Sequence, residues 1–203
     1  MGASGWSYFV PYQEDVAEAL KMLQEHIFVE ERYTANWWYD SIPNTCWDDM
    51  WRVMSKLHQS WIEIAGIDRS WEGFAQAVLE ELARVLEEKQ IAIVLPKPPQ
   101  TIEDLLQQTD ADGTHSILDI AGIAEQPAFR MATPLSREEH LALLGTEKPT
   151  RARVEAALVQ QREQRKPWEK GLEDIRGGWQ AIYFIVYKDD TPDELCFCGL
   201  SGD

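Results

Sequence analysis

The chain has 203 residues, a length that suits one large domain or two small ones. Hydrophobic residues make up 44% of it and charged residues 27%, a composition that excludes disorder for the bulk of the chain. Its formal net charge of −16 disfavours direct binding to nucleic acids or to anionic membranes, and favours a basic partner.

The three cysteines are too few and too unevenly spaced for a disulfide framework. Cys196 and Cys198 would share one face of a strand, so buried free thiols are the expected state. Neither these two nor Cys46 has nearby metal ligands, and we expect no metal or other cofactor. No apolar run reaches the roughly 18 residues of a membrane span, and the first ten residues lack signal-peptide features. These observations predict a cytoplasmic protein with no membrane association.

The chain opens with a predicted strand followed by a helix. Residues 6–10 are aromatic and β-branched, and Pro11 suits the end or edge of a strand. From Glu14 to about Glu30 apolar residues recur at helical spacing, which predicts an amphipathic helix. The residues at that spacing are Val16, Leu20, Leu23 and Ile27.

Residues 34–72 hold six of the nine tryptophans. Thr45 and Asp48 resemble a capping box, after which one helical stripe is expected to be buried. A second helix is predicted over Trp71–Glu88, and the two would form a helical hairpin inserted over residues 34–90. The first stripe consists of Trp47, Met50, Trp51, Met54, Leu57, Trp61 and Ile64; the second consists of Phe74, Val78, Leu82 and Val85, with Ala77 and Leu86 alongside.

The middle of the chain alternates short elements with breakers. Residues 91–95 form an apolar run typical of a buried strand, and the proline-rich residues 96–100 are the best linker candidate. A short helix is expected from Thr101 to before Asp112, where a turn begins. Residues 116–120 are predicted as a strand.

The last part predicts two helices and a hairpin. Ser136 and Glu139 form a capping box for a helix that ends at Gly145, and a second helix runs from Pro149 to about Lys166. Residues 179–187 form a strand without a charge, and residues 194–199 return antiparallel to it. Seven bases and three acids lie within residues 148–170, which either pack on the protein's own acidic surface or face an anionic partner.

These elements predict an α+β fold with a mixed or antiparallel sheet of about four to five strands, packed by several helices. We expect one domain over residues 1–203, carrying the Trp-rich insertion.

No catalytic residue is predicted. None of the four histidines lies in a metal-binding or nucleophile-activating pattern, and adjacent acids in so acidic a chain arise by chance. His115 and Ser116 would point to opposite faces of a strand, which argues against a Ser/His/Asp triad. A ligand pocket at the strand ends is the better alternative, and its polar residues would be Tyr8, Tyr12, His115, Asp119 and Tyr183.

Two stretches carry a resemblance. Residues 5–12 (GWSYFVPY) run into a helix rich in alanine and leucine, and residues 113–120 (GTHSILDI) are followed by a C-terminal hairpin ending in SGD. In these stretches the chain resembles small uncharacterised bacterial α+β proteins. The resemblance covers the two ends of the chain and implies no activity or functional residue.

The leading hypothesis is a non-enzymatic bacterial interaction protein with an accessory, immunity-like or regulatory role. It would bind a protein partner with a basic surface by electrostatic steering and aromatic anchors. Alternatives are an enzyme or small-ligand binder near His115, and an acidic mimic of nucleic acid; the oligomeric state is left open. The predicted binding residues are Trp37, Trp38, Tyr39, Asp40, Asp48 and Asp49.

Overall fold

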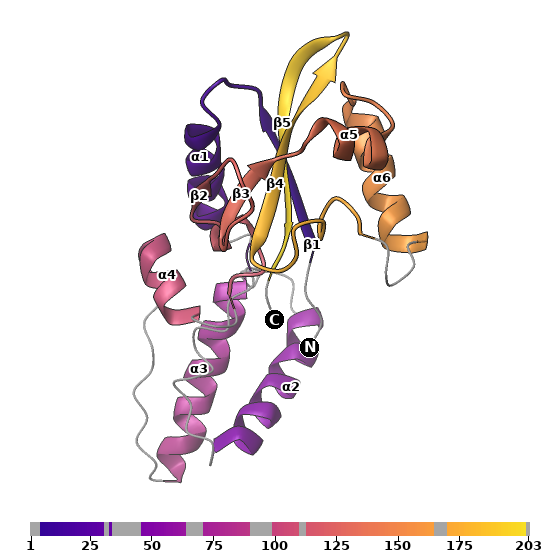
Figure 1. Ribbon diagram of the computed structural model, residues 1–203. Coiled ribbons are helices and arrows are strands. Elements are labelled where there is room, and N and C mark those ends of the chain that lie inside the picture. The colour runs from indigo at the N-terminus through magenta and orange to yellow at the C-terminus, as the bar shows by residue number, and fades with distance from the viewer. Residues whose placement is uncertain are drawn as a thin grey trace. The chain divides into compact units, whose positions relative to one another are not determined.

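The chain forms two compact units, shown in a computed structural model (Figure 1). The first unit comprises Met1–Tyr33 and Ala111–Asp203, and the second comprises Thr34–Asp110. The expected organisation, one domain over 1–203 with a Trp-rich insertion over 34–90, stays a prediction. The structure describes residues 5–30, 33, 46–63, 71–89, 99–109, 113–164 and 170–201.

The first unit contains a five-stranded mixed sheet with the order β1-β5-β4-β3-β2. β5 is antiparallel to both β1 and β4, whereas β3 is parallel to β2 and β4. This confirms the predicted α+β class and the C-terminal hairpin. The strands are β1 (Gly5–Pro11), β2 (Gly122–Ile123), β3 (Met131–Pro134), β4 (Gln180–Lys188) and β5 (Thr191–Leu200).

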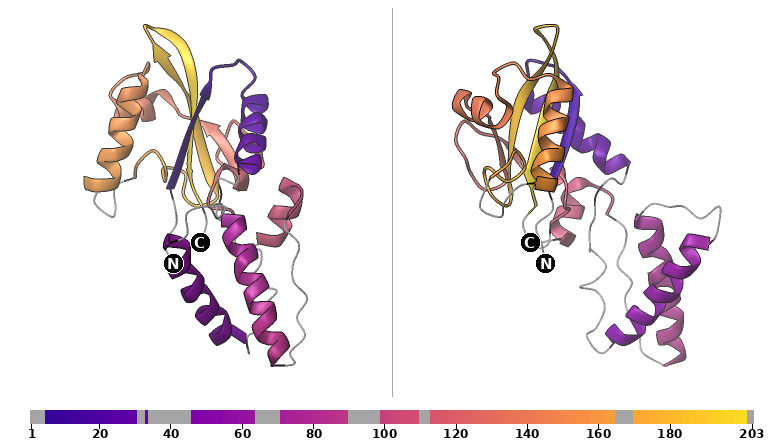
Figure 2. Two further views of the ribbon diagram at one scale, coloured as in Figure 1. Left: turned by 180° about the vertical axis from the view of Figure 1, so that it is seen from behind. Right: turned by 90° about the vertical axis from the view of Figure 1, so that its right-hand side faces the viewer.

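Helices cover both faces of this sheet. Figure 2 shows α1 on one face and α5 and α6 on the other. The helices of this unit are α1 (Val16–Val29), α5 (Arg137–Leu144) and α6 (Arg151–Gln164), with the short 3-10 helix η2 (Ile117–Asp119). The second unit contains α2 (Trp47–Glu63), α3 (Trp71–Glu88) and α4 (Ile102–Thr109).

The α5 and α6 side of the sheet buries an apolar cluster. Alternate residues of β4 and β5 point into it, among them the buried, free thiols of Cys196 and Cys198, as their spacing predicted. Burial raises the pKa of the Cys198 thiol well above its ordinary value, so the group stays neutral. The cluster consists of Leu135, Leu144, Val154, Leu158, Leu172, Ile182, Phe184, Val186, Cys196 and Cys198.

On the opposite face α1 buries Leu20, Leu23 and Ile27. The Gln24 side chain donates hydrogen bonds to the carbonyl oxygens of Ile117 and Ile120, at 3.2 and 2.6 Å. These bonds connect α1 to the segment around η2, ninety-three and ninety-six residues further along the chain.

One prediction in the first unit is wrong, and two short strands were not predicted. Residues 116–120 form η2 instead of a strand, because the Ser116 hydroxyl accepts the Leu118 N–H and the Asp119 carboxylate accepts the Thr114 N–H. Such local side-chain bonds compete with strand pairing. β2 and β3 were not predicted, since two and four residues are too short to show a periodic pattern. The predicted strand over residues 91–95 and residues 96–98 of the predicted linker lie outside the described residues.

In the second unit α2 packs against α3. Asp49, near the start of α2, accepts two hydrogen bonds from Lys89, just after α3, at 2.7 and 2.6 Å. Lys56 and Glu81 form a second ion pair at 3.0 Å, so the two helices run antiparallel. The buried apolar residues here are Cys46, Met50, Val53, Val78, Leu79, Leu82 and Leu86.

The predicted stripe of α2 is confirmed at Met50 and wrong at Trp51, whereas the side chains of Trp47, Leu57, Trp61 and Ile64 lie outside the described part of the chain. Cys46, Met50 and Val53 are buried, whereas Trp51, which was expected inside, has an exposed fraction of 53%. Trp51 lies about 100° around the helix from Met50, which places it beside the face that Cys46, Met50 and Val53 bury.

We expect Gly199→Ala to lower the free energy of unfolding by about 2 kcal/mol, because the new Cβ would lie 2.7 Å from both the Gln180 carbonyl oxygen and the Trp6 ring. Urea denaturation measures the change. Gly122→Ala is the matched control, since its Cβ would meet only the Met131 side chain at 3.6 Å. An equal loss in both variants would contradict this account of the crowding at Gly199.

Glu139 of α5 closes the capping box with Ser136 and binds the guanidinium of Arg176. Arg176 also donates to the Thr133 hydroxyl of β3 at 3.1 Å, so the pair links α5 to the sheet. The Arg176 hydrogen bonds lower the pKa of Glu139 from its ordinary 4.5 to about 2. A lowered carboxyl pKa contributes stability that is complete above pH 4.5 and is lost as the pH falls towards 2.

Glu139→Gln should therefore cost about 2 kcal/mol at neutral pH and flatten the decline of stability below pH 4.5. Denaturation curves at several pH values measure both effects. Glu138→Gln, at the exposed neighbouring position, should change neither; a matching loss there would show that helix charge, not the Arg176 pair, is responsible.

Candidate functional site

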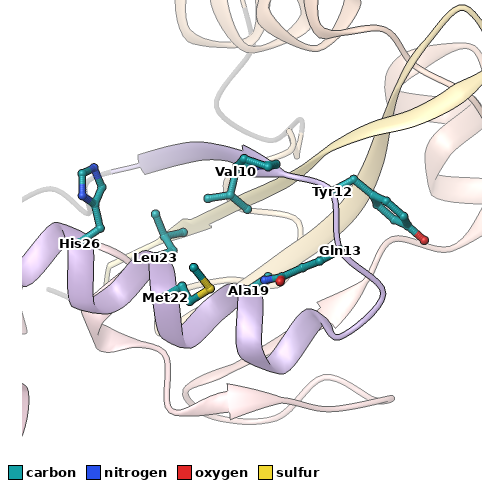
Figure 3. A pocket seen from close by; sticks show the side chains of 8 residues that line it. Val10, Tyr12, Gln13, Ala19, Met22, Leu23 and His26 are labelled. Carbon is teal, nitrogen blue, oxygen red and sulfur yellow. The ribbon is translucent and has the colours of Figure 1, made fainter.

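An apolar groove of about 260 Å³ lies between β1 and α1 in the first unit. Figure 3 shows Val10 of β1 and Leu23 of α1 pointing towards each other, with His26 at one end and Tyr12 at the other. The groove is lined by Val10, Pro11, Tyr12, Gln13, Ala19, Met22, Leu23 and His26.

The local sequence explains why β1 and α1 flank a groove. Pro11 ends β1, and the Tyr12 N–H donates to the Asp193 carbonyl oxygen at 2.9 Å before the chain turns. Asp15 caps α1 by accepting the Glu18 N–H at 3.0 Å, so the helix starts immediately. Ala19 faces the strand with a side chain too small to fill the space between the two elements.

The apolar surface continues along α1 beyond the groove. Met22 and Val29 have exposed fractions of 56% and 78%, and their spacing of seven residues places them on one side of the helix. Exposed large apolar side chains that adjoin a groove are typical of a protein-interaction surface.

Acids border this apolar surface. Glu18 and Glu25 lie four residues before and three residues after Met22, positions that share its side of the helix. Both are exposed, and neither forms an ion pair among the described residues. From residue 14 to residue 30 the only lysine or arginine is Lys21, whereas the acids are Glu14, Asp15, Glu18, Glu25 and Glu30, of which Glu30 pairs with His26 at 3.2 Å. The groove therefore has apolar walls and a negative rim.

The binding residues predicted from the tryptophan-rich segment have separate outcomes. Trp37, Trp38, Tyr39 and Asp40 lie outside the described residues.

Asp48 is exposed at the start of α2, whereas Asp49 is 6% exposed and held by Lys89. Trp51 follows Asp48 by three residues and is exposed, so these two side chains share one side of α2. The sequence pattern assigned Trp51 to the core and therefore missed this aromatic contact candidate.

The residues of the alternative pocket are only partly brought together. Tyr8 of β1 and Tyr183 of β4 both pair with Phe197 of β5, one on each side of that strand. Tyr12 lies at the end of β1 that adjoins the groove. His115 and Asp119 share one turn. Asp119 accepts a hydrogen bond from Ser201, which follows β5, so this turn lies at the end of the β1–β5 ladder that is far from Tyr12.

Asp119 holds this turn together. It is 1% exposed, and its carboxylate accepts bonds from the Thr114 N–H at 2.7 Å, the Thr114 hydroxyl at 2.9 Å and the Ser201 hydroxyl at 3.3 Å. Burial raises the pKa of Asp119, although the hydrogen bonds from Thr114 and Ser201 oppose the shift. The side chain thus connects the turn to the end of β5 and does not face solvent.

A second hollow of about 190 Å³ is lined by Tyr183, the one residue of the predicted alternative pocket among its lining residues. It lies along β4, and its lining includes His140, Glu147 and Tyr187. The Nδ1 atom of His140 is buried and has no hydrogen-bond partner within the part of the chain that is described. Burial lowers the pKa of His140, against the opposing charges of Glu147 and Glu139, so the ring is neutral near pH 7.

Among the described residues no group of three or more potential ligands could hold a metal ion, and no helix there is long and apolar enough to cross a bilayer. Comparisons with protein-family models, with curated proteins and with solved structures find no match to this chain. The geometry of its own residues is therefore the basis for a functional assignment.

We expect Asp119→Asn to be tolerated, because an amide can accept from Thr114 and donate to Ser201. A carboxyl with a raised pKa disfavours the folded state as the pH rises above its ordinary value of 3.8, so the uncharged amide should make stability less dependent on pH above that point. Asp119→Ala should cost about 2 kcal/mol, since it leaves buried donors unpaired. Denaturation at pH 4 and pH 7 measures both; equal losses in the two variants would contradict a hydrogen-bonding role.

Proposed function

We propose that the protein is a non-enzymatic interaction protein that binds a segment of a basic protein partner in the groove between β1 and α1. The observation that supports this most directly is an open apolar groove that adjoins exposed Met22. Val29 extends the exposed apolar surface, and the exposed acids Glu18 and Glu25 border it. Apolar contacts would supply affinity, and the acids would select a basic partner and speed association.

The exposed pair Asp48 and Trp51 supports the same function from the second unit, because tryptophan is enriched at binding hot spots. It offers the chemistry proposed for the tryptophan-rich segment as a whole, an aromatic anchor beside an acid. An accessory or regulatory role in bacteria is part of the proposal.

A reducing, cytoplasmic location is also proposed. Cys46, Cys196 and Cys198 are all free and buried, and buried free thiols suit a compartment in which disulfides do not form. The alternative of a small-ligand pocket at the strand ends has weaker support, because Asp119 is buried and engaged in hydrogen bonds.

A display library of random peptides, selected on the full chain, tests the proposal. We expect enrichment of peptides that combine lysine or arginine with large apolar residues, and binding that weakens as salt is added. Met22→Glu should weaken the selected peptides by at least about tenfold, because it places a charge in the apolar contact. Fluorescence polarisation measures the affinities.

Leu141→Glu is the matched control, because Leu141 is 48% exposed on α5, away from the groove. It should leave the affinity unchanged. Enrichment without basic residues, or equal losses in the two variants, would refute the proposal. A loss on Trp51→Ala without a loss on Met22→Glu would overturn the assignment to the groove and place binding on α2.

A further inference from the structure

The edge of the sheet beside the groove suggests how a partner segment would bind, and this inference rests on the proposed function. β1 pairs with β5 along all seven of its residues and has no strand on its other side among the described residues. The groove adjoins the last residues of this strand, Val10 and Pro11. An extended chain placed along β1 would therefore lie next to the apolar groove.

The register identifies which backbone groups of β1 are available. The Tyr12 N–H donates to β5, and in an antiparallel pair the residues facing the partner alternate with those facing away. Trp6, Tyr8 and Val10 therefore bond to β5, whereas Ser7 and Phe9 direct their N–H and C=O groups to the free edge. Pro11 also faces outwards but has no N–H to donate.

Within the strand itself, β1 lacks two of the devices that commonly protect edge strands, charged residues and an internal proline. The sequence of β1, GWSYFVP, contains no charged residue, and its single proline is the last residue. The opposite edge strand, β2, has only two residues, and shortness is itself a protection. An uncharged edge of seven residues that adjoins a groove is suited to pairing with another strand.

Charge decides between two occupants of this edge. A second copy of the chain would bring another net charge of −16 and another acidic α1 to the same place. Like charges brought together oppose that association, whereas a basic segment is attracted to Glu18 and Glu25. The more favourable occupant is an extended segment of a basic partner.

We infer that the partner segment binds by strand addition to β1. Its backbone pairs with the N–H and C=O groups of Ser7 and Phe9, and alternate apolar side chains enter the groove beside Met22. In this mode backbone hydrogen bonds supply affinity, and the pockets for alternate side chains supply specificity.

Ser7→Pro tests the pairing, with a synthetic peptide of about ten alternating valines and lysines as the probe. The substitution removes an N–H that faces away from β5, so the β1–β5 ladder is kept. We expect the probe to bind at least about tenfold more weakly to Ser7→Pro. Ser7→Ala, which keeps the N–H, should bind it normally.

Amide hydrogen exchange on the unaltered protein gives an independent readout should the proline variant fail to fold. In the free protein the amides of Ser7 and Phe9 should exchange faster than those of Tyr8 and Val10. Addition of the probe should slow the exchange of Ser7 and Phe9. Unchanged exchange at these two amides under saturating probe would overturn strand addition.

N-methylated probes provide a further check, because the two edges of an added strand are not equivalent. A probe methylated at all valine amides and a probe methylated at all lysine amides should differ in affinity for the protein, and one of the two modifications should abolish binding. Equal binding of both methylated probes would also overturn the inference.

The outcomes separate this inference from the proposed function. Loss of binding on Met22→Glu, with normal binding by a folded Ser7→Pro, refutes strand addition and leaves the groove as the binding site. Normal binding by both variants refutes both proposals. Sedimentation of the purified chain tests the other occupant. If the chain self-associates and Ser7→Pro abolishes this, a second copy is the occupant, and the choice of a basic partner is overturned.

Discussion

The first unit depends on the pairing of β5 with β1 on one side and with β4 on the other. The five consecutive residues from Leu195 to Gly199 are buried, so both faces of β5 are covered. Its ladder with β1 joins residues 5–11 to residues 194–200, which are far apart in the sequence, and its ladder with β4 joins residues 180–188 to residues 191–200. Without these ladders the apolar cluster under α5 and α6 would not form, and α1 would have no sheet surface to pack against.

This pairing also determines where the candidate groove lies. β5 fixes which residues of β1 face α1 and which backbone groups face outwards. Pro11 and the Asp15 cap then turn the chain so that α1 begins within a few residues. The groove, the free edge and the acidic side of α1 therefore all lie within the β1–α1 segment, and the pairing of β1 with β5 positions that segment.

Several features followed from local patterns alone. Apolar spacing located α1, the Ser136 capping box and Gly145 located α5, and the uncharged run before residue 188 located β4. The patterns failed where tertiary contacts decide, as at Trp51, which lies one residue away from the face that packs on α3. They also failed at η2, where the side chains of Ser116 and Asp119 accept hydrogen bonds from nearby backbone N–H groups, and these bonds outweigh strand propensity.

The sequence by itself determined the α+β class, the hairpin of β4 and β5, most helices and the negative charge, because these depend on local periodicity and composition. The candidate site could not be read from it, since Val10 and Met22 become groove walls only when β5 positions β1. The tertiary structure alone decided that β1 is an edge strand, that Met22 and Val29 stay exposed and that Asp119 is buried. Strand order, and the choice of which apolar or charged side chains depart from the burial that their local pattern suggests, arise from contacts between residues far apart in the chain.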